Sequence, residues 1–420
     1  MGIQAYKESE VGRIPIDWSV KQIGKIGYTY SGLTGKGKND FGKGNSRYIT
    51  FLNVLNNPVL RTDIFEKVSI SDGEHQNLAL KGDLFFNTSS ETPEEVGICA
   101  LLDDDVPNLY LNSFCFGYRL TDQEVDGLFL SYFFRSKAGR DIMTMLAQGA
   151  TRYNLSKESF NKTLIAFPPF DEQKKIADAL SGVDDMIGAL DEAIAKKRQI
   201  KVGLMQQLLT GKTRLPGFSG EWREVELKEF GYMIRGVSYK PEDSSLKPED
   251  GYVRLLRSNN IQEGKMVYSD YVYVKSANVA DYQYMKDGDI LICMANGSKQ
   301  LVGKAARLTR AGVYTFGAFM GVFRCNDVTI CPFVGELLKT GSYRKLLDDI
   351  LTGSAINNLN AAAVESLKFF VPSDSQEQRA IAEVLCKADD EINWLEGQRE
   401  KYRLIKQGMM QELLTGKTIL

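Results

Sequence analysis

The sequence predicts an α+β fold, in which two similar mixed α/β modules are joined by two long helices that form an antiparallel coiled coil with pseudo-twofold symmetry. The first observation behind this prediction is an internal repeat. Residues 172–215 align without a gap on residues 377–420, and 23 of the 44 positions are identical, whereas average composition gives roughly three by chance. The second is a line of apolar residues that recurs in steps of three and four along both copies, as a coiled-coil seam requires.

The repeat divides the chain into four segments. We expect a first module over residues 1–170, a first long helix over 171–212, a second module over 213–373 and a second long helix over 374–420. A helix of ~39 residues extends for ~58 Å. Both copies end in Leu-Leu-Thr-Gly-Lys-Thr, so we expect the two helices to stop in the same way.

The two modules keep a common frame, although their sequences have diverged. Short similar motifs occur in both modules at offsets of 201 to 206 residues. Short apolar or β-branched runs predict strands at 83–86, 266–274 and 289–293. Apolar periodicity predicts helices at 129–146 and 333–351. Each module is therefore expected to be a mixed α/β domain.

The composition is that of an ordinary globular protein with few means of catalysis. Hydrophobic residues make up 43% of the chain, and the formal net charge is −2. The single histidine, His75, lies in a polar stretch, so we expect a solvated loop residue and exclude histidine-based zinc sites. Six cysteines without a Cys-x-x-Cys pair predict buried thiols. Because neither a membrane-length apolar run nor a signal sequence is found, we expect a cytoplasmic protein without membrane contact.

Two short motifs point toward nucleotide or cofactor chemistry, and both fail. Gly-Lys-Thr at 211–213 has the last letters of a phosphate-binding loop, but Gln206 stands where that loop requires glycine, and the motif follows a helix instead of opening one. We interpret Gly211 as a helix C-cap. Phe-Pro-Pro at 167–169 resembles the signature of amino methyltransferases, but it lacks the preceding polar residue that holds the target amine. No catalytic residue and no metal ligand is predicted.

Basic, hydroxyl and amide side chains gather in three loops that recur at equivalent places in both modules. Lysine and arginine neutralise phosphates, and amide or guanidinium groups pair with adenine or guanine edges, so we predict that these loops contact DNA. In the first module the predicted contacts are Lys36, Lys38, Lys43, Asn45, Arg47, Ser89, Ser90, Thr151, Arg152 and Tyr153. In the second module they are Arg235, Tyr239, Lys240, Arg257, Asn259, Asn296, Ser298, Lys299, Gln300 and Asn357.

The whole chain resembles the specificity subunits of type I restriction–modification systems. The resemblance rests on the segment 7–15 with Trp18, on Pro-Pro-x-x-Glu-Gln at 168–173, on Arg-Leu-Pro-Gly-Phe at 214–218, and on the paired Gln-x-Leu-Leu-Thr-Gly-Lys endings. The start of the second helix departs from this pattern, because only Pro372 precedes it.

The resemblance implies that each module is a target recognition domain for one half of a bipartite site in double-stranded DNA. It also implies that the helices set the spacing and dock two methyltransferase subunits, with restriction subunits joining in systems that cleave. S-adenosylmethionine, ATP and Mg²⁺ would then be bound by those partners, and this chain itself would hold no cofactor.

Two other functions stay open at this point. The chain could itself be a DNA methyltransferase or a fused modification enzyme, against which the failed Phe-Pro-Pro motif and the lack of a cofactor glycine loop count. It could also be a scaffold that binds proteins across its coiled coil, which the near-neutral charge favours and the basic and amide loops oppose. The half-site sequences and the gap between them do not follow from the sequence.

Overall fold

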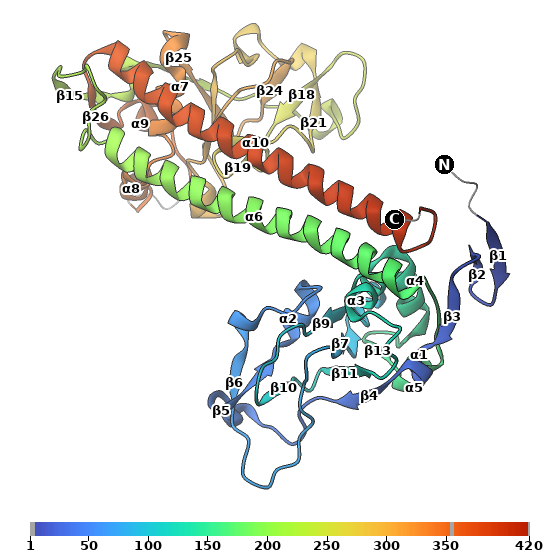
Figure 1. Ribbon diagram of the computed structural model, residues 1–420. Helices are drawn as coiled ribbons and strands as arrows, with labels where there is room; N and C mark the ends of the chain where they lie inside the picture. Colours follow the sequence, from blue (N-terminus) through green and yellow to red (C-terminus); the bar gives the residue numbers. More distant parts are fainter. Residues whose placement is uncertain (1–4, 353–356, 419–420) are drawn as a thin grey trace. The chain divides into compact units, whose positions relative to one another are not determined.

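The computed structural model describes residues 5–352 and 357–418 (Figure 1). The chain forms two compact units, unit 1 with Met1–Asp191 and Gly397–Leu420, and unit 2 with Glu192–Glu396. Two helices of 39 residues each, α6 (Phe170–Leu208) and α10 (Ser375–Leu413), begin in one unit and end in the other. Each unit therefore contains one globular module and half of each long helix.

The centre of unit 1 is a four-stranded sheet in the order β4-β11-β7-β9. A second sheet has the order β10-β5-β6, and β14 pairs with β3. The strands are β1 (Tyr6–Ser9), β2 (Gly12–Pro15), β3 (Ser19–Gln22), β4 (Gly27–Ser31), β5 (Phe41–Ile49), β6 (Glu66–Val68), β7 (Leu84–Asn87), β8 (Ser89–Ser90), β9 (Cys99–Leu101), β10 (Leu109–Leu111), β11 (Cys115–Leu120), β12 (Ala147–Gln148), β13 (Tyr153–Leu155) and β14 (Leu164–Phe167). The helices are α1 (Ile23–Ile26), α2 (Phe51–Asn56), α3 (Gly127–Arg135), α4 (Lys137–Leu146) and α5 (Lys157–Lys162).

Unit 2 repeats this topology. Its central sheet has the order β16-β25-β22-β23, its second sheet the order β17-β21-β18-β24, and β15 pairs with β26. The strands are β15 (Trp222–Glu226), β16 (Gly231–Arg235), β17 (Ser244–Ser245), β18 (Tyr252–Leu256), β19 (Ile261–Gln262), β20 (Lys265–Met266), β21 (Val272–Lys275), β22 (Ile290–Cys293), β23 (Ala305–Arg307), β24 (Tyr314–Phe316), β25 (Met320–Cys325) and β26 (Lys368–Pro372). The helices are α7 (Cys331–Leu337), α8 (Gly341–Thr352) and α9 (Ala361–Glu365). The predicted duplication thus extends through the diverged modules.

The two predicted module helices are each divided in the structure. Ser136 separates α3 from α4, and its hydroxyl accepts a hydrogen bond from the Gly139 amide at 3.2 Å. In unit 2 the Thr340 hydroxyl accepts one from the Tyr343 amide at 3.2 Å, between α7 and α8. Hydroxyl side chains at such positions favour a helix start over a continuing helix. The helical segments predicted at 129–146 and 333–351 are therefore confirmed, each as two helices separated by a hydroxyl residue.

The strand predicted over 266–274 is also divided, into β20 and β21. Asn260 is fully buried, and its amide donates to the carbonyl oxygens of Val267 at 3.0 Å and Ser269 at 2.8 Å. Asp270 adopts a φ of 52°, which a strand residue does not. These side-chain hydrogen bonds replace the ladder that a continuous strand would make. The strands predicted at 83–86 and 289–293 are confirmed as the buried strands β7 and β22.

The ends of the long helices complete the cores of both modules. In unit 1, Ile176 and Leu180 of α6 and Leu413 of α10 are buried in one cluster with the module's aromatic core. In unit 2, Leu208 of α6 and Leu385 of α10 are buried with that module's core. Burying a leucine side chain contributes roughly 1.5–3 kcal/mol, so each module is stabilised by both helices.

Charged residues join α6 to α10 between these apolar ends. In unit 1, Arg399 of α10 contacts Asp191 of α6 at 2.8 Å. In unit 2, Arg198 of α6 contacts Glu396 of α10 at 2.7 Å, and Lys197 pairs with Glu391. In unit 1 the partner on α10 moves back from Lys406 to Arg399 as α6 advances from Asp184 to Asp191. In unit 2 it moves back from Glu391 to Asp389 as α6 advances from Lys197 to Lys201. The pairing is therefore antiparallel, as predicted.

Each long helix ends at a glycine that packs against a tryptophan of the same unit. Gly211 and Gly416 have φ values of 70° and 68°, which glycine adopts without strain. A Cβ at Gly211 would lie 3.3 Å from the Trp222 ring, and one at Gly416 would lie 3.2 Å from the Trp18 ring. The Gly-Lys-Thr motif therefore follows the helix as a C-cap, and its interpretation is confirmed.

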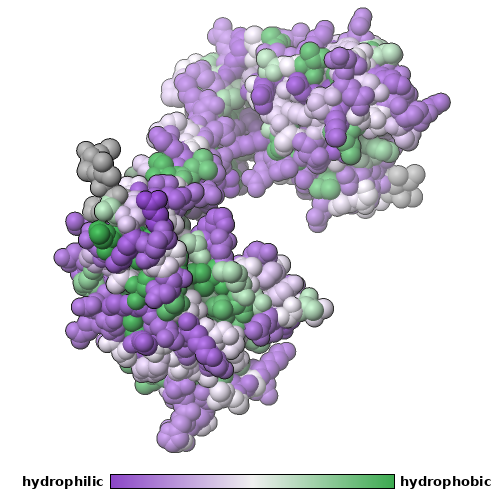
Figure 2. Space-filling model, turned by 90° about the vertical axis from the view of Figure 1, so that its right-hand side faces the viewer, coloured by the Kyte–Doolittle hydropathy of each residue, from purple (hydrophilic) through white to green (hydrophobic). Residues whose placement is uncertain are grey.

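Several smaller expectations hold within the described residues. His75 is exposed in a loop. All six cysteines are unbridged; Cys99, Cys115, Cys293 and Cys331 are buried as expected, whereas Cys325 and Cys386 are only half-buried. In the part of the chain that the structure describes, no helix is long and apolar enough to cross a membrane. The face drawn in Figure 2 is mostly hydrophilic, with hydrophobic residues gathered in small patches.

Candidate nucleic-acid interface

The predicted second and third loops lie side by side at one end of the central sheet in both units. In unit 1, β8 pairs with β13, so Ser90 stands opposite Tyr153. In unit 2, Ala295 bridges Asn358, and the Asn296 amide N–H donates to the Asn357 carbonyl at 3.4 Å. The third loop of unit 2 lies partly outside the described residues, because these resume at 357. The same meeting of loops in both units makes this sheet end the candidate site.

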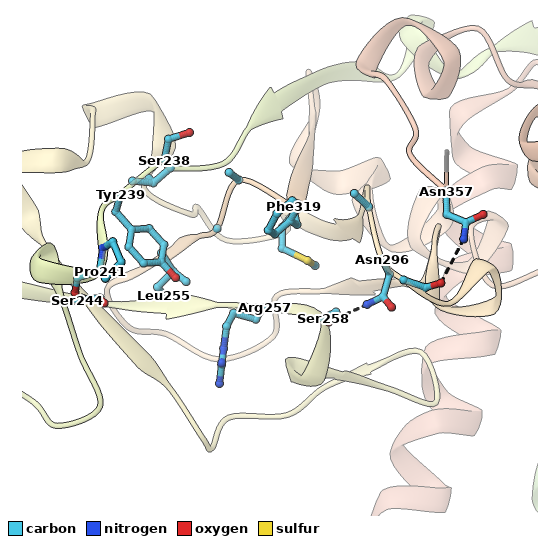
Figure 3. A pocket seen from close by; sticks show the side chains of 16 residues that line it. Ser238, Tyr239, Pro241, Ser244, Leu255, Arg257, Ser258, Asn296, Phe319 and Asn357 are labelled. Atoms are coloured by element: carbon cyan, nitrogen blue, oxygen red, sulfur yellow. Dashed lines mark hydrogen bonds between the residues drawn. The ribbon is translucent and has the colours of Figure 1, made fainter. Parts of the chain in front are cut away.

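In unit 2 this sheet end opens into a groove with a volume of about 1090 Å³. Four of the predicted contact residues line it, namely Tyr239, Arg257, Asn296 and Asn357 (Figure 3). They come from four separate stretches of the chain. The other lining residues are Val237, Ser238, Pro241, Ser244, Leu255, Ser258, Ala295, Gly297, Gly317, Ala318, Phe319 and Met320. None of these sixteen residues is acidic, so the lining suits an anionic or neutral polar ligand.

Arg257 supplies the positive charge of the groove. Its side chain is 38% exposed, and its guanidinium makes a 3.4 Å contact with Asp270, which is 74% exposed. Among the described residues its Nε has no hydrogen-bond partner. An exposed ion pair of this length contributes between 0 and about 1 kcal/mol. The guanidinium also donates to the Asp270 backbone carbonyl at 3.2 Å, so a ligand that binds it competes with Asp270.

Two amide side chains stand on the opposite wall. The Asn296 amide N–H₂ group donates to the Ser258 hydroxyl at 3.4 Å, and that of Asn357 donates to the Gly297 carbonyl at 3.2 Å (Figure 3). The Asn296 carbonyl oxygen accepts from the Ser298 amide at 3.0 Å. Each amide is positioned by its neighbours and keeps further hydrogen-bonding capacity, since an Asn side chain has two donors and two acceptor lone pairs.

The other predicted residues of unit 2 lie outside this lining. Arg235 lines an adjoining cavity of about 280 Å³. Lys240 is exposed, as are Ser298 and Gln300. The Asn259 amide is bound to Asp270, and the Lys299 ammonium donates to the Thr352 hydroxyl at 3.2 Å. Of the predicted residues that line the groove, the first loop therefore supplies two, Tyr239 and Arg257, and the second and third loops supply one each.

The first loop of unit 1 presents its residues on and beside β5. Lys38, Lys43, Asn45 and Arg47 are exposed there. The Lys36 ammonium instead pairs with the Glu74 carboxylate at 2.5 Å, and its side chain is only 7% exposed.

Hydrogen bonds from Lys36, from the Gln76 side chain and from the Ser71 amide lower the pKa of Glu74 to about 2. The charge of Lys36 is therefore matched by an ionised carboxylate at neutral pH. Of the basic residues in this loop, Lys36 is the least available to a phosphate.

The remaining predicted residues of unit 1 gather at the sheet end. Ser89 is buried and Ser90 half-buried on β8, while Thr151 and Arg152 are exposed in the turn before β13. The Ser90 hydroxyl donates to the Glu95 carboxylate at 2.9 Å. The exposed turn, and not the serine pair, therefore offers the accessible contacts of this edge.

Sequence reasoning missed one prominent residue of the groove. Phe319 lines it while 74% of its side chain stays exposed. It precedes β25, in a turn without charge or amide groups, so a search for basic and amide loops did not find it. A signal was present, because Phe114 stands 205 residues earlier at the corresponding turn before β11 and is 58% exposed.

The arrangement offers recognition chemistry. Arginine, asparagine, tyrosine and phenylalanine residues line one concave surface, and arginine and asparagine side chains pair with base edges while phenylalanine can contact a thymine methyl group. In the described part of the chain, no group of three or more His, Cys, Asp or Glu side chains is placed to hold a metal ion. Phe167, in the motif that resembles a methyltransferase signature, is buried and packs near Phe129 with ring centroids 6.2 Å apart.

The sequence model of a family described as the type I restriction modification DNA specificity domain matches the chain twice, at residues 15–201 and 219–401. The specificity subunit of the EcoKI type I restriction enzyme from Escherichia coli (strain K12) is 33% identical over 184 residues, which cover 44% of this chain and 39% of that subunit. A putative type I restriction enzyme MjaX specificity subunit from Methanocaldococcus jannaschii is 26% identical over 429 residues, covering 98% of this chain and 96% of that protein.

Solved structures share the fold at low sequence identity. The S subunit of a type I restriction–modification system from M. genitalium matches with a TM-score of 0.60 and 16% identity, over 95% of this chain and 96% of that one. A chain from a structural study of complex assembly and conformational transition in a type I system matches with a TM-score of 0.56 and 16% identity, over 96% and 99%.

Proposed function

The chain belongs to the family of type I restriction–modification DNA specificity domains, and we propose that it is the non-catalytic subunit that selects the DNA sequence. Each module reads one half of a bipartite site in double-stranded DNA. The matching segment covers less than two fifths of the EcoKI subunit's length, so the activity of that whole protein enters here only as part of the proposal.

One observation carries the proposal. The two modules have the same topology, and in each of them the loops lie at the corresponding end of its own central sheet. The basic and amide residues of these loops differ between the modules. Arg257 and Asn296 in the groove of unit 2 are side chains that pair with guanine and adenine edges. Unit 1 offers Arg152 and Arg47 instead, both exposed. Different residues on one scaffold suit two different half-sites.

The helices have two tasks in this proposal. Their nearly repeated sequence presents the same docking surface twice, for two methyltransferase subunits, and their length fixes the gap between half-sites. S-adenosylmethionine, ATP and Mg²⁺ are bound by those partners and by restriction subunits where these are present. This chain then needs no cofactor of its own.

The formal net charge of −2 supports a division of labour in DNA binding. Phosphate contacts supply most of the affinity of a DNA-binding protein and depend steeply on salt. We infer that the partner subunits supply many of these contacts, while this chain supplies base contacts. The isolated chain then binds DNA weakly and with little sequence preference.

Binding measurements on the purified chain test the proposal against its main rival. Calorimetry with S-adenosylmethionine should give no binding to the chain alone, and binding once the methyltransferase subunit of the same system is added. DNA binding measured in parallel should become sequence-selective only in the assembled complex. Stoichiometric S-adenosylmethionine binding by the chain alone would instead make it a modification enzyme.

A further inference from the structure

An exposed phenylalanine occurs at the same place in both modules. Phe114 precedes β11 and Phe319 precedes β25, the corresponding central-sheet strands, at an offset of 205. Their side chains are 58% and 74% exposed. Single exposed apolar residues are common on protein surfaces, but here the same one is retained at a turn where the neighbouring residues have changed from Asn-Ser to Gly-Ala.

The backbone of this turn is held from the central sheet in both units. The Phe114 carbonyl accepts from the Thr88 amide at 2.9 Å and from the Thr88 hydroxyl at 2.7 Å. The Phe319 carbonyl accepts from the amides of Met294 at 2.9 Å and Ala295 at 3.1 Å. In each unit the donors follow the next strand of the central sheet, so the phenyl ring projects from a fixed base.

A second contact holds the turn from its other side. A Cβ at Gly32 would lie 2.0 Å from the Asn112 carbonyl oxygen, and one at Gly236 would lie 2.0 Å from the Gly317 carbonyl oxygen. Only glycine permits so close an approach of two backbones. This pair of glycines recurs in both modules, so the placement of the ring is built twice in the same way.

The surroundings of Phe319 indicate what it meets. The ring lies in the groove with Arg257 and Asn296, and Figure 3 shows it between the wall that carries Tyr239 and the wall that carries Asn296. A surface that combines an exposed ring with guanidinium and amide groups and no carboxylate complements a nucleic-acid base, which has an apolar face and polar edges. Phe114 stands in unit 1 beside the sheet end with Ser90 and Tyr153, through its contact with Thr88.

We propose that Phe114 and Phe319 are paired DNA-contacting residues, each of which places its ring against bases of the half-site that its own module reads. The inference rests on the proposed function and adds to it one apolar anchor in each module. The ring makes either a contact with a thymine methyl group in the major groove or a wedge at a base step. In both cases the contact belongs to one half-site only.

The test uses the full chain assembled with its methyltransferase subunit and carrying Phe319→Ala or Phe114→Ala. Competition binding is measured with duplexes altered in one half-site at a time. Each substitution should weaken binding to the intact site roughly fivefold or more, as loss of an aromatic contact to a base does. Phe319→Ala should abolish part of the discrimination at the second half-site only, and Phe114→Ala at the first only.

Two controls keep the result interpretable. Val328→Ala removes another exposed apolar side chain of unit 2, 56% exposed and packed near Gly288 at the other end of β22, and should change nothing. Phe319→Leu keeps apolar bulk and should retain intermediate binding. Thermal unfolding of each variant separates loss of contact from loss of fold.

Several outcomes decide the matter. Unchanged binding and discrimination in folded Phe114→Ala and Phe319→Ala complexes would overturn the inference while leaving the proposed function intact. A native complex without any half-site discrimination would overturn both. Replacing one thymine at a time by deoxyuridine, which lacks the methyl group, distinguishes the two forms of contact. If the ring contacts a methyl group, one such replacement should weaken binding by the native complex but not by the alanine variant. If the ring is a wedge at a base step, no single replacement should have this effect.

Discussion

The Lys406 ammonium lies 2.6 Å from the Asp184 carboxylate, where α10 meets α6 in unit 1. The Tyr132 hydroxyl donates to the same carboxylate at 2.8 Å. In unit 2, at an offset of 205 for both residues, Lys201 pairs with Asp389 at 2.5 Å. Lys201 and Lys406 are therefore each matched by an aspartate of the opposite helix. The polar positions of the coiled coil fix its register in the antiparallel sense.

Asp184→Asn is expected to lower the free energy of unfolding by about 1–2 kcal/mol, because the partly buried Lys406 loses its charged partner. Asp389→Asn should lower it by less, because Lys201 keeps a second carboxylate, that of Glu336, at 3.2 Å. Glu383→Gln is the control, since Glu383 pairs with Lys387 on the exposed face of α10, with exposures of 66% and 71%. Glu383→Gln should lower the free energy of unfolding by less than about 0.5 kcal/mol. Urea unfolding of the full chain measures all three, and equal losses would contradict the assignment.

Glu172 and Glu377 occupy the same repeat position but should respond oppositely to amidation. Glu377 is 1% exposed and receives two hydrogen bonds from Arg214, at 2.5 Å and 2.6 Å. Burial raises the pKa of Glu172, and the nearby Trp18 only partly counteracts it. Glu377→Gln should therefore lower the melting temperature at pH 7, and Glu172→Gln should raise it.

The pH dependence follows from the sign of the Glu172 shift. A carboxyl group whose pKa is higher in the folded state binds more protons there, so the folded protein gains stability as the pH falls. This gain develops as the pH falls through the raised pKa and is complete below the ordinary value of 4.5. Melting temperatures of the native chain and of Glu172→Gln should converge at low pH. A constant difference at all pH values would contradict the account.

Arg257→Ala is expected to reduce binding of the assembled complex to its site by about 1–3 kcal/mol and to relax sequence preference in one half-site, if the guanidinium makes a bidentate contact to a base. Arg257→Lys should fail to restore the preference, because an ammonium cannot form the planar two-point contact. Arg223→Ala removes an exposed arginine of the same unit, which pairs with Glu229. Binding assays in which Arg223→Ala and Arg257→Ala behave alike would remove Arg257 from the interface.

Lengthening both helices should widen the gap between half-sites. Seven residues that continue the heptad are inserted after Asp191 and after Glu396, which are equivalent positions in the repeat. Each insertion adds roughly 10.5 Å of helix, or about three base pairs of DNA, and keeps the seam in register. The methylated sequence should keep its half-sites and gain unspecified bases between them. An unchanged gap would show that the helices do not set it.

The repeat and the apolar seam were sufficient to predict the architecture. Identical positions at a fixed offset imply equivalent surroundings, and the seam has a period that only a long helix satisfies. The C-cap role of Gly211 and Gly416 followed from their place after the last seam residue. These features depend on local sequence and on the repeat, so they are visible without coordinates.

The division of the helices and strands depended on single side chains. Ser136 and Thr340 start new helices through their hydroxyl groups, and Asn260 ends a strand by binding the carbonyl of Val267. The same residue types occur inside continuous elements elsewhere, because tertiary contacts decide which hydrogen bond wins. Their effect was therefore not predictable from sequence alone.

The candidate site was predicted in part. Tyr239, Arg257, Asn296 and Asn357 were found from residue type and loop position, and they meet in one groove. Residue type did not indicate Phe319, because neither its side chain nor those of its neighbours are polar. The sequence also could not distinguish an available lysine from one that is already paired. The DNA contacts themselves stay predictions.

The central claim is that each module selects one half of a bipartite site. Mapping N6-methyladenine in a host that carries this chain with its methyltransferase subunit tests it most directly, with a host that lacks this chain as control. The account predicts one motif with two specified blocks and a fixed unspecified gap, altered in one block only by Arg257→Ala. A single continuous motif, or the same methylation without this chain, would contradict it.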